Sequence, residues 1–594
     1  MLERLRPLFP YMLRYRRGLI YGGLSVLFTN AIWILFPQVI QRAIDDLSTG
    51  VTREKLLLYA LALVAVALAK GVFQFLTRWI VIGVSRDIEY DMRNDLFQHL
   101  ESLAHDYYQR TRTGDIMART TNDLNAVRQM LGPAIMYSAN TLVFTAGALI
   151  FMFGISPKLT LVAFLPLPAV SILIQYFGTR IHERFERIQA TFSDISARAQ
   201  ENFSGARVIR AYVQEEAEIE HFATANREYI ARSLKLVQLM GMLWPTLQTL
   251  LGLAVVLVLW LGGREVLAGR ISVGQFVAFN TYMVQLTWPI IALGWVINIY
   301  QRGTASMARI NEILTERATI SDENVAPDLK GQEIELRGDI EFRDLTFAFP
   351  EGGEASAGAT RGNEVLRNIN LRIPAGSSLA IVGPTGSGKT TLVSLIPRIL
   401  DANKGMVLID GRPIADYPLQ ALRRNIGYVP QETFLFSDSI RENIAFGTAS
   451  ATDEQIHAAA NGASIAADIE GFPEGYKTVV GERGITLSGG QKQRTAIARA
   501  IIRDPKILVL DDALSSVDTY TEERILNHLR DVMQGRTTIL ISHRVSTVRS
   551  ADKIAVLHDG SIVEYGTHEE LIQREGYYTD LYNKQLLEEE LAQV

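Results

Sequence analysis

The chain has 594 residues, more than a single hydrophobic core usually organises, so several domains are expected. A formal net charge of −5 gives no sign of a nucleic-acid partner. The absence of cysteine excludes a disulfide framework, a cysteine-based zinc site and a thiol nucleophile.

Long apolar runs occupy the first half of the chain and are missing from the second half. A helix that spans a bilayer needs ~20 largely apolar residues, and six runs meet this requirement. They predict spans at about residues 18–39, 56–85, 133–155, 159–177, 237–261 and 271–299. We therefore expect an all-α membrane domain over residues 1–310.

Two polar links of about fifty residues, 86–128 and 179–235, separate spans two and three and spans four and five. Their helical periodicity and high charge predict membrane helices that continue into water and return after turns near residues 113–115 and 204–205. Arginines are concentrated before the first span and in the first long link. This bias places the N-terminus and both long links in the cytoplasm.

Polar side chains within the second predicted span share one helix face, because Lys70, Gln74 and Arg78 recur every four residues. One interpretation is a polar stripe that lines a water-filled path between the helices. The other is that Arg78 reaches the membrane interface and Lys70 pairs with backbone or a neighbouring helix. The cores of the six spans contain no Asp or Glu, so any ligand bound between them is expected to be a neutral or anionic amphiphile rather than a cationic one.

The second half has the pattern of an α/β domain. Residues 311–337 form a polar linker, and short strands alternate with helices over residues 338–585. Residues 351–362, rich in Gly, Ala and Glu, are interpreted as a hairpin insertion without chemistry of its own. The acidic tail, 586–594, is expected to fray.

A phosphate-binding loop follows the predicted strand at residues 378–382. It matches the P-loop pattern G-x-x-x-x-G-K-[ST] and consists of Gly383, Pro384, Thr385, Gly386, Ser387, Gly388, Lys389, Thr390 and Thr391. The glycines let backbone N–H groups surround phosphate oxygens, Lys389 reaches the β- and γ-phosphates, and Thr390 binds Mg²⁺. The helix after the loop adds its positive N-terminal end. The loop predicts an ATP and Mg²⁺ site.

A second Mg²⁺ ligand is predicted at the end of another strand. The apolar run 507–510 ends in Asp511. An acidic residue at the tip of a buried strand beside a P-loop typically anchors the metal. The alternative, a buried structural Asp, fits less well because the P-loop is already present.

The segment Leu487–Gln491 reads Leu-Ser-Gly-Gly-Gln, a signature that resembles ABC ATPases and almost nothing else. Supporting motifs follow in the family's pattern: Gln431 in Val-Pro-Gln-Glu, Asp518 in Ser-Ser-Val-Asp, and His543 in Ile-Ser-His-Arg. Phe349 stands where the family usually has a Tyr that stacks on adenine. Phe keeps the ring face and loses only the hydroxyl, so stacking should survive.

The resemblance extends over essentially the whole chain. The six spans, the long links and the segment from Thr113 to Asp123 are similar to bacterial ABC exporters, particularly one subunit of heterodimeric multidrug exporters, and also to homodimeric lipid flippases. This implies a six-helix transmembrane domain with long cytoplasmic extensions, followed by an α/β P-loop nucleotide-binding domain. It also implies a multi-pass protein of the bacterial inner or plasma membrane, with its ATP-binding domain in the cytoplasm.

The resemblance further implies that two nucleotide domains pair head to tail, so that the P-loop of one and the signature of the other enclose each ATP. The residues implied to bind ATP on the signature side are Ser488, Gly489, Gly490 and Gln491, and Asp518 is implied as a further ATP-binding residue. Gln431 is implied both as an Mg²⁺ ligand and, with the two turns of the long links, as a contact between the halves. Glu482 would add a contact there, or be an ordinary solvated acid.

The implied catalytic residues are Asp512 and His543, and the first departs from the family pattern. The family usually places Glu directly after the Mg²⁺ acid, where it positions the attacking water. Asp is one methylene shorter, and a misplacement of about 1 Å can cost ~10²-fold in rate. We expect Asp512 to be a poor base, unless the local backbone adjusts.

An intact signature beside a substituted base resembles one subunit of an asymmetric heterodimer, which implies a partner that carries the Glu. A homodimeric lipid or multidrug exporter is the main alternative, and an ATP-gated channel or regulatory subunit is a weaker one. The fusion order argues against an importer, and six spans exclude a soluble ABC ATPase. Drugs, lipids and peptides all remain possible substrates.

Overall fold

The computed structural model describes residues 5–329, 334–349, 364–448, 450–481, 487–515 and 519–592. The chain divides into two compact units, one formed by Met1–Phe97 with Met117–Leu314 and the other by Gln98–Ile116 with Thr315–Val594. The insertion expected at residues 351–362 lies outside the described residues, and so does part of the linker.

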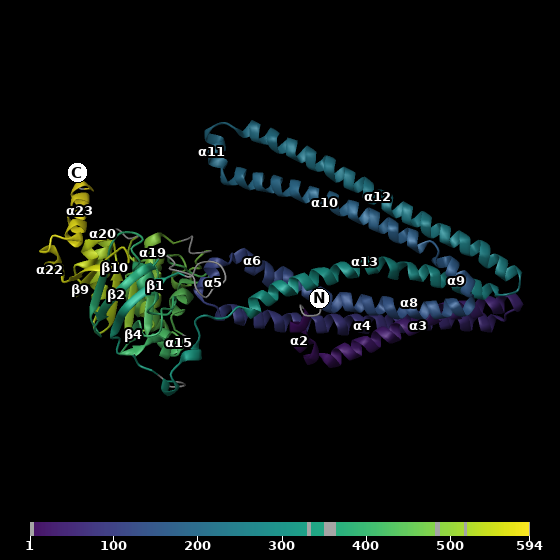
Figure 1. Ribbon diagram of the computed structural model, residues 1–594, viewed down its shortest axis with the longest axis horizontal. Helices are drawn as coiled ribbons and strands as arrows, with labels where there is room; N and C mark the ends of the chain where they lie inside the picture. Colours follow the sequence, from purple (N-terminus) through teal and green to yellow (C-terminus); the bar gives the residue numbers. More distant parts are fainter. Residues whose placement is uncertain are drawn as a thin grey trace. The chain divides into compact units, whose positions relative to one another are not determined.

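Long helices form the first unit (Figure 1). Six stretches in the described part of the chain are long and apolar enough to cross a membrane, which confirms the predicted number of spans. They are Arg16–Thr49 (α3), Arg53–Ser102 (α4), Thr113–Ile155 (ending in α8, Ile135–Ile155), Pro157–Ser204 (α9, Pro157–Phe164, and α10, Leu167–Ser204), Glu215–Leu267 (α12) and Val273–Thr315 (α13).

Several of these helices are much longer than a bilayer requires. α4 has 50 residues and α12 has 53, against the ~20 that span the hydrocarbon region. The surplus confirms that membrane helices continue as extensions. α10 and α12 lie side by side (Figure 1), and Arg232 Nη1 donates to Thr191 Oγ1 at 2.8 Å between them.

The turns of the two long links each contain a short helix, α5 (His105–Arg110) and α11 (Ala206–Ala211). The second turn begins at the end of α10, where the sequence predicted it. The first begins earlier than predicted, because Ala104 and Thr111 are extended on either side of α5. Gly114, the residue in this link with the lowest helix propensity, lies inside α6 (Thr113–Ala118).

Within the first unit, α3 is held to α8 and α13 by buried polar contacts. Asn30 Nδ2 donates to Asn140 Oδ1 at 2.6 Å, and the fully buried Tyr282 hydroxyl donates to the Ile34 carbonyl at 2.7 Å. The Lys70 ammonium lies 3.3 Å from the centroid of the Trp33 ring. This cation–π contact favours the interpretation that Lys70 pairs with a neighbouring helix.

The second unit contains two sheets within the described ranges. The antiparallel sheet has the order β2-β1-β4-β5, formed by β1 (Ile340–Ala348), β2 (Glu364–Ile373), β4 (Val407–Ile409) and β5 (Arg412–Pro413). The other has the order β10-β9-β3-β8-β7-β6, formed by β3 (Ser378–Val382), β6 (Ile426–Val429), β7 (Ile507–Asp511), β8 (Thr537–Ile541), β9 (Lys553–His558) and β10 (Ser561–Gly566). Only β10 pairs antiparallel in this second sheet.

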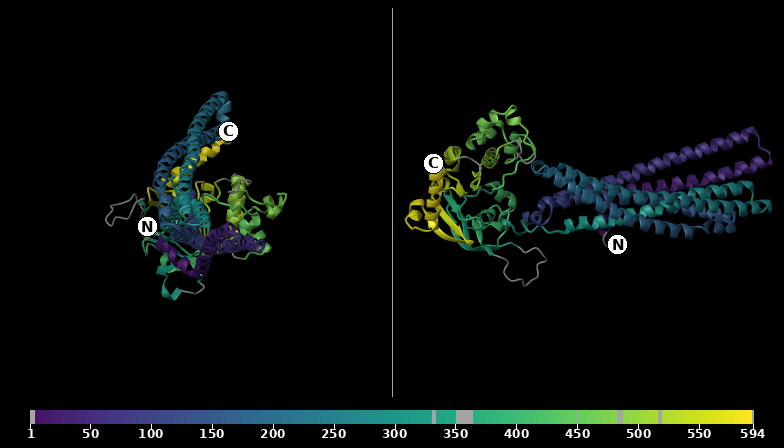
Figure 2. Two further views of the ribbon diagram at one scale, coloured as in Figure 1. Left: turned by 90° about the vertical axis from the view of Figure 1, so that its right-hand side faces the viewer. Right: turned by 90° about the horizontal axis from the view of Figure 1, so that it is seen from above.

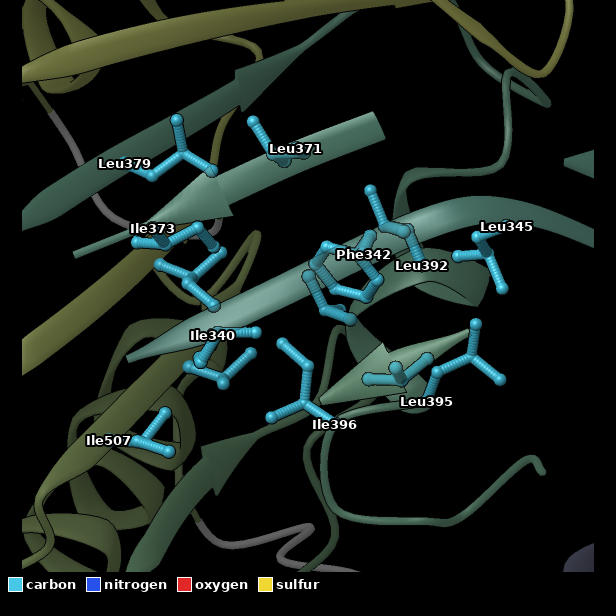
Figure 3. Close-up of a cluster of buried hydrophobic side chains, with 14 of the residues drawn as sticks. Ile340, Phe342, Leu345, Leu371, Ile373, Leu379, Leu392, Leu395, Ile396 and Ile507 are labelled. Atoms are coloured by element: carbon cyan, nitrogen blue, oxygen red, sulfur yellow. The ribbon is translucent and has the colours of Figure 1, made fainter. Parts of the chain in front are cut away.

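Every residue of β7 and β8 is buried, which explains why β7 is apolar up to Asp511 and why β8 ends in three apolar residues. Figure 3 shows the main core, where Ile340 and Phe342 of β1 meet Leu395 and Ile396, which follow the P-loop helix α14 (Lys389–Ser394). This packing fixes the loop that precedes α14.

A separate core joins the helices α16 (Ile440–Ala445), α17 (Asp453–Gly462), α18 (Ala466–Glu470), α19 (Gly489–Ile501) and α20 (Thr519–Met533). Leu487 belongs to this core, so the start of α19 is anchored to it. The C-terminal helices α22 (His568–Ile572) and α23 (Tyr577–Ala592), drawn in yellow in Figure 2, pack in a third cluster with β9.

Candidate active site

The P-loop joins β3 to α14, and two of its glycines are required by their surroundings. Gly383 has φ +151°, and a Cβ there would lie 2.0 Å from the Leu557 carbonyl oxygen. Gly388 has φ +99°, and its Cβ would meet Leu366 Cδ2 at 2.8 Å. Neither position tolerates a side chain, so the loop keeps the tight curve that exposes its N–H groups.

Lys389 lies over the loop that it follows. Its ammonium donates to the carbonyl oxygens of Gly383 and Pro384, both at 2.9 Å. Burial lowers the pKa of Lys389, and the nearby Asp511 and Asp512 carboxylates oppose that shift. A third N–H of the ammonium group remains available for a phosphate oxygen.

Thr390 and Asp511 meet beside the loop. The Thr390 hydroxyl donates to Asp511 Oδ1 at 3.2 Å, whereas the buried Asp511 Oδ2 has no hydrogen-bond partner among the described residues. Burial raises the pKa of Asp511, and the hydrogen bond from Thr390 opposes that shift. A buried carboxylate oxygen without a partner next to a hydroxyl is a donor set that fits Mg²⁺, which prefers oxygen ligands.

One cavity of about 250 Å³ brings the predicted residues together. P-loop residues line it together with Gln431, Asp511, Asp512 and His543, which come from separate segments of the sequence. A larger cavity of about 1230 Å³ shares Gln431 and Asp511 and is also lined by Phe349. The Phe349 ring is 41% exposed and meets Phe347 edge to face at 5.3 Å, so one of its faces can accept a stacked base.

The backbone of Asp512 is held on both sides. Its N–H donates to the Ile541 carbonyl at 2.9 Å, and its φ is +48°, in the left-handed region. Its carbonyl accepts the Ser515 N–H at 3.3 Å and the Ser515 hydroxyl at 3.0 Å. The buried Gln493 side chain in turn donates to the Ser515 hydroxyl oxygen at 3.0 Å. This backbone has little freedom to move Asp512 toward a substrate.

His543 is exposed and lines the smaller cavity together with the P-loop residues. Its backbone carbonyl accepts a hydrogen bond from the Gln585 side chain of α23. The C-terminal helix therefore fixes the segment that carries the imidazole.

The signature begins α19 and is separate from these cavities. Ser488 caps the helix: its hydroxyl oxygen accepts the Gln491 N–H at 3.3 Å, and Gln491 Oε1 accepts the Ser488 N–H at 3.0 Å. Among the described residues that line either cavity, none belongs to Leu487–Gln491. Within one chain the signature therefore does not meet the P-loop. Glu482 and Asp518 lie outside the described residues.

The comparisons with known proteins agree with these motifs. A family model described as "ABC transporter transmembrane region" matches residues 19–290, and one described as "ABC transporter" matches residues 366–515. A Bacillus subtilis protein, "Probable multidrug resistance ABC transporter ATP-binding/permease protein YheI", is 37% identical over 97% of this chain and 96% of its own length. The chain belongs to the ABC transporter family.

Two further ABC proteins show the type of transporter. The "ATP-dependent lipid A-core flippase" of Syntrophus aciditrophicus is 35% identical over 96% of this chain and 92% of its own length. The solved structure of a bacterial Atm1-family ABC exporter with ATP bound superimposes with a TM-score of 0.77 at 29% identity, over 96% of this chain and 99% of that one. Both matches span the membrane and ATP-binding halves, so the chain has the ABC exporter fold.

As an ABC exporter, this chain is a multi-pass membrane protein that binds ATP and couples its hydrolysis to transport. ABC exporters work as dimers in the membrane. The separation of the signature from the P-loop within one chain is consistent with a site completed by a second subunit.

Sequence reasoning missed residues that support the ABC motifs without belonging to them. Asp468 contacts Gln491 and Arg494 contacts the Gly490 carbonyl in the first turn of α19, and Gln493 holds Ser515. The capping box could have been found, because Ser488 and Gln491 have its S-x-x-Q spacing. No spacing rule links Asp468 to residues twenty or more positions later.

Proposed function

We propose that this chain is one subunit of a heterodimeric exporter of hydrophobic or amphipathic compounds, and that ATP bound at its own P-loop is hydrolysed slowly. The observation that carries the proposal is Asp512, an Asp where the family has Glu, on a backbone held by Ile541 and Ser515. Its partner subunit would carry the Glu.

At this chain's site, the P-loop N–H groups and Lys389 bind the β- and γ-phosphates. Thr390, Asp511 and Gln431 would hold Mg²⁺, which when bound neutralises phosphate charge. Phe349 stacks on adenine and His543 faces the γ-phosphate. The support is that Thr390, Gln431 and Asp511 line the smaller cavity with the P-loop and the larger one with Phe349.

Slow hydrolysis at this site follows from the short side chain of Asp512. Asp is one methylene shorter than Glu, so its carboxylate ends about 1 Å short of the usual position, a displacement that can cost ~10²-fold. Backbone adjustment could restore the reach. Here the N–H and the carbonyl of Asp512 are both engaged, and Ser515 is itself fixed by Gln493. The observed contacts therefore favour a poor base over an adjusted one.

The intact signature gives this chain its second role. Ser488, Gly489, Gly490 and Gln491 would complete the partner subunit's site, where hydrolysis is fast. ATP at this chain's own site would remain bound for longer. A dimer with one fast site and one slow site explains why this chain keeps an intact signature but has a substituted base.

The substrate class rests on the spans and on relatives. The cores of the predicted spans carry no Asp or Glu, so this half offers no buried anion to a cation. Relatives are named as a multidrug resistance transporter and as a lipid A-core flippase. Arginines near the spans support an ATP-binding domain on the cytoplasmic side of a bacterial membrane.

Copurification tests the assembly. The tagged chain, extracted from its native membrane, should bring down a different ABC half-transporter that has Glu at the position of Asp512. Vesicles containing the pair should accumulate an amphiphile against its gradient when ATP is added. Recovery of a second copy alone would favour a homodimeric exporter, and downhill leak without accumulation would favour a gated channel.

A further inference from the structure

Asp468 of α18 belongs to no motif of the sequence, yet it contacts the signature directly. We propose that Asp468 is a positioning residue: through Gln491 and Arg494 it holds the first turn of α19, so that Ser488 meets ATP on the partner subunit's P-loop. This inference rests on the proposed function of the signature.

The capping box determines which hydrogen Ser488 can offer. Its hydroxyl oxygen accepts the Gln491 N–H at 3.3 Å, which leaves the hydroxyl hydrogen free to point outward. Ser488 and Gly489 are exposed, at the positive end of a 13-residue helix. The face is therefore suited to an anionic oxygen, provided that the Gln491 side chain stays in place.

Asp468 keeps the Gln491 side chain in place. Gln491 Nε2 donates to Asp468 Oδ1 at 3.1 Å, while Gln491 Oε1 accepts the Ser488 N–H at 3.0 Å. Both ends of the amide are thus engaged, one by the carboxylate and one by the cap. A Gln side chain has high rotamer entropy, so losing the contact with Asp468 would loosen the contact with Ser488.

Arg494 ties the same carboxylate to the body of α19. Its Nη1 donates to Asp468 Oδ2 at 2.7 Å and to the Ser464 carbonyl at 2.6 Å, and its side chain is only 9% exposed. Such a buried cation needs a charged partner. Asp468 is itself anchored, because its neighbour Ile469 is fully buried in the helical core. The carboxylate therefore links the signature turn to a rigid support.

Loss of the Asp468 carboxylate should have a consequence that general structural damage would not have. Asp468 contacts the signature side and does not line either cavity that contains the P-loop, within the described residues. Its loss should slow hydrolysis at the partner subunit's site and leave ATP binding at this chain's own P-loop intact.

The test compares Asp468→Ala with Ser488→Ala in the purified dimer in which the chain assembles. Two quantities are measured: the kcat for ATP, and photolabelling of this chain by azido-ATP, which reports its own P-loop. Asp468→Ala should lower kcat by ~10-fold or more, since misplacing a binding group by about 1 Å can cost up to ~10²-fold. Photolabelling of this chain should stay within ~2-fold of the parent, because sites that share no contacts usually act independently. Asp468→Asn, which keeps the shape, replaces the Ala variant if that variant does not assemble.

The two variants separate the possible failures. If Ser488→Ala lowers kcat and Asp468→Ala does not, the positioning role is wrong and the signature's role stands. If Ser488→Ala leaves kcat unchanged, the proposed role of the signature fails, and the inference fails with it. If Asp468→Ala lowers kcat and labelling together, the residue serves the fold as a whole, which also overturns the inference.

Discussion

The P-loop face and the signature face of this chain differ in how fully their polar atoms are hydrogen-bonded. On the P-loop face, Asp511 Oδ2 and Ser387 Oγ are buried without hydrogen-bond partners among the described residues. On the signature face, Ser488, Gln491, Asp468 and Arg494 bond to one another. Unpaired buried groups favour binding of a complementary ligand, whereas a satisfied network favours rigid presentation. The P-loop face is therefore suited to nucleotide binding, and the signature face is suited to holding Ser488 in a fixed position.

The largest expected effect is on the P-loop face. Replacing Lys389 by Ala removes the charge that lies over the loop, and ATP binding to the purified chain should weaken by ~10²-fold or more, as charge-assisted contacts to phosphate are strong. Equilibrium binding of a fluorescent ATP analogue measures the change. Lys404→Ala is a matched control, because Lys404 forms an exposed ion pair with Asp416 and should have no effect. An equal loss of ATP binding in both variants would contradict the assignment of nucleotide binding to the P-loop face.

Asp511→Asn should separate metal binding from stability. The Asn oxygen can still accept from Thr390, but the charge proposed to attract Mg²⁺ is gone, so Mg²⁺-dependent tightening of ATP binding should fall by ~10-fold or more. The ligand-free variant should unfold at a higher temperature at neutral pH. Titration with Mg²⁺ checks the change in ATP binding, and thermal scans check the change in unfolding temperature. A variant that loses stability at neutral pH would contradict this account.

The sign of the pH dependence follows from the raised pKa of Asp511. The buried carboxylate costs stability above its folded-state pKa, and the cost fades as pH falls through that value. Below the unfolded-state pKa near ~3.9 the cost is absent. The difference in unfolding temperature between Asp511→Asn and the parent should therefore shrink as the pH is lowered from 7 toward 4.

A smaller effect is expected at Phe349. Phe349→Ala removes the ring proposed to stack on the base and should weaken ATP binding by ~10-fold, since base–aromatic stacking contributes ~1–3 kcal/mol. Phe349→Tyr keeps the ring and should bind within ~2-fold of the parent. Competition between ATP and GTP provides a second readout, because a stacking platform discriminates little between bases. If Phe349→Ala binds as well as the parent, another residue holds the base.

Features encoded by local sequence were predictable, and features made by distant contacts were not. The spans need only a run of apolar residues, and the P-loop needs only its glycines, Lys389 and Thr390 in one segment. The first turn was misplaced because neither Gly nor Pro marks the break between α4 and α5. Domain boundaries stay predictions.

The candidate site shows the same division. Asp511 was predictable because an apolar strand ends there, and the structure brings it to Thr390 at 3.2 Å. Asp468 was not predictable, because its contact with Gln491 depends on how α18 packs against α19. The support of Asp512 by Ile541 and Ser515 depends equally on a neighbouring strand and a turn. Residues that support a motif are found only once the chain is folded.

The central claim is that Asp512 makes this chain's own site slow, and one measurement addresses it directly. ATP hydrolysis by the purified chain, reconstituted without its partner so that two copies pair and each intact signature completes the other copy's site, is compared with that of Asp512→Glu, with equal ATP binding as the control. The account predicts little turnover by the parent and a gain of ~10²-fold in the variant, since the longer side chain restores the missing reach of about 1 Å. A parent that already hydrolyses ATP rapidly and gains nothing from Asp512→Glu would contradict the account and indicate a homodimeric pump.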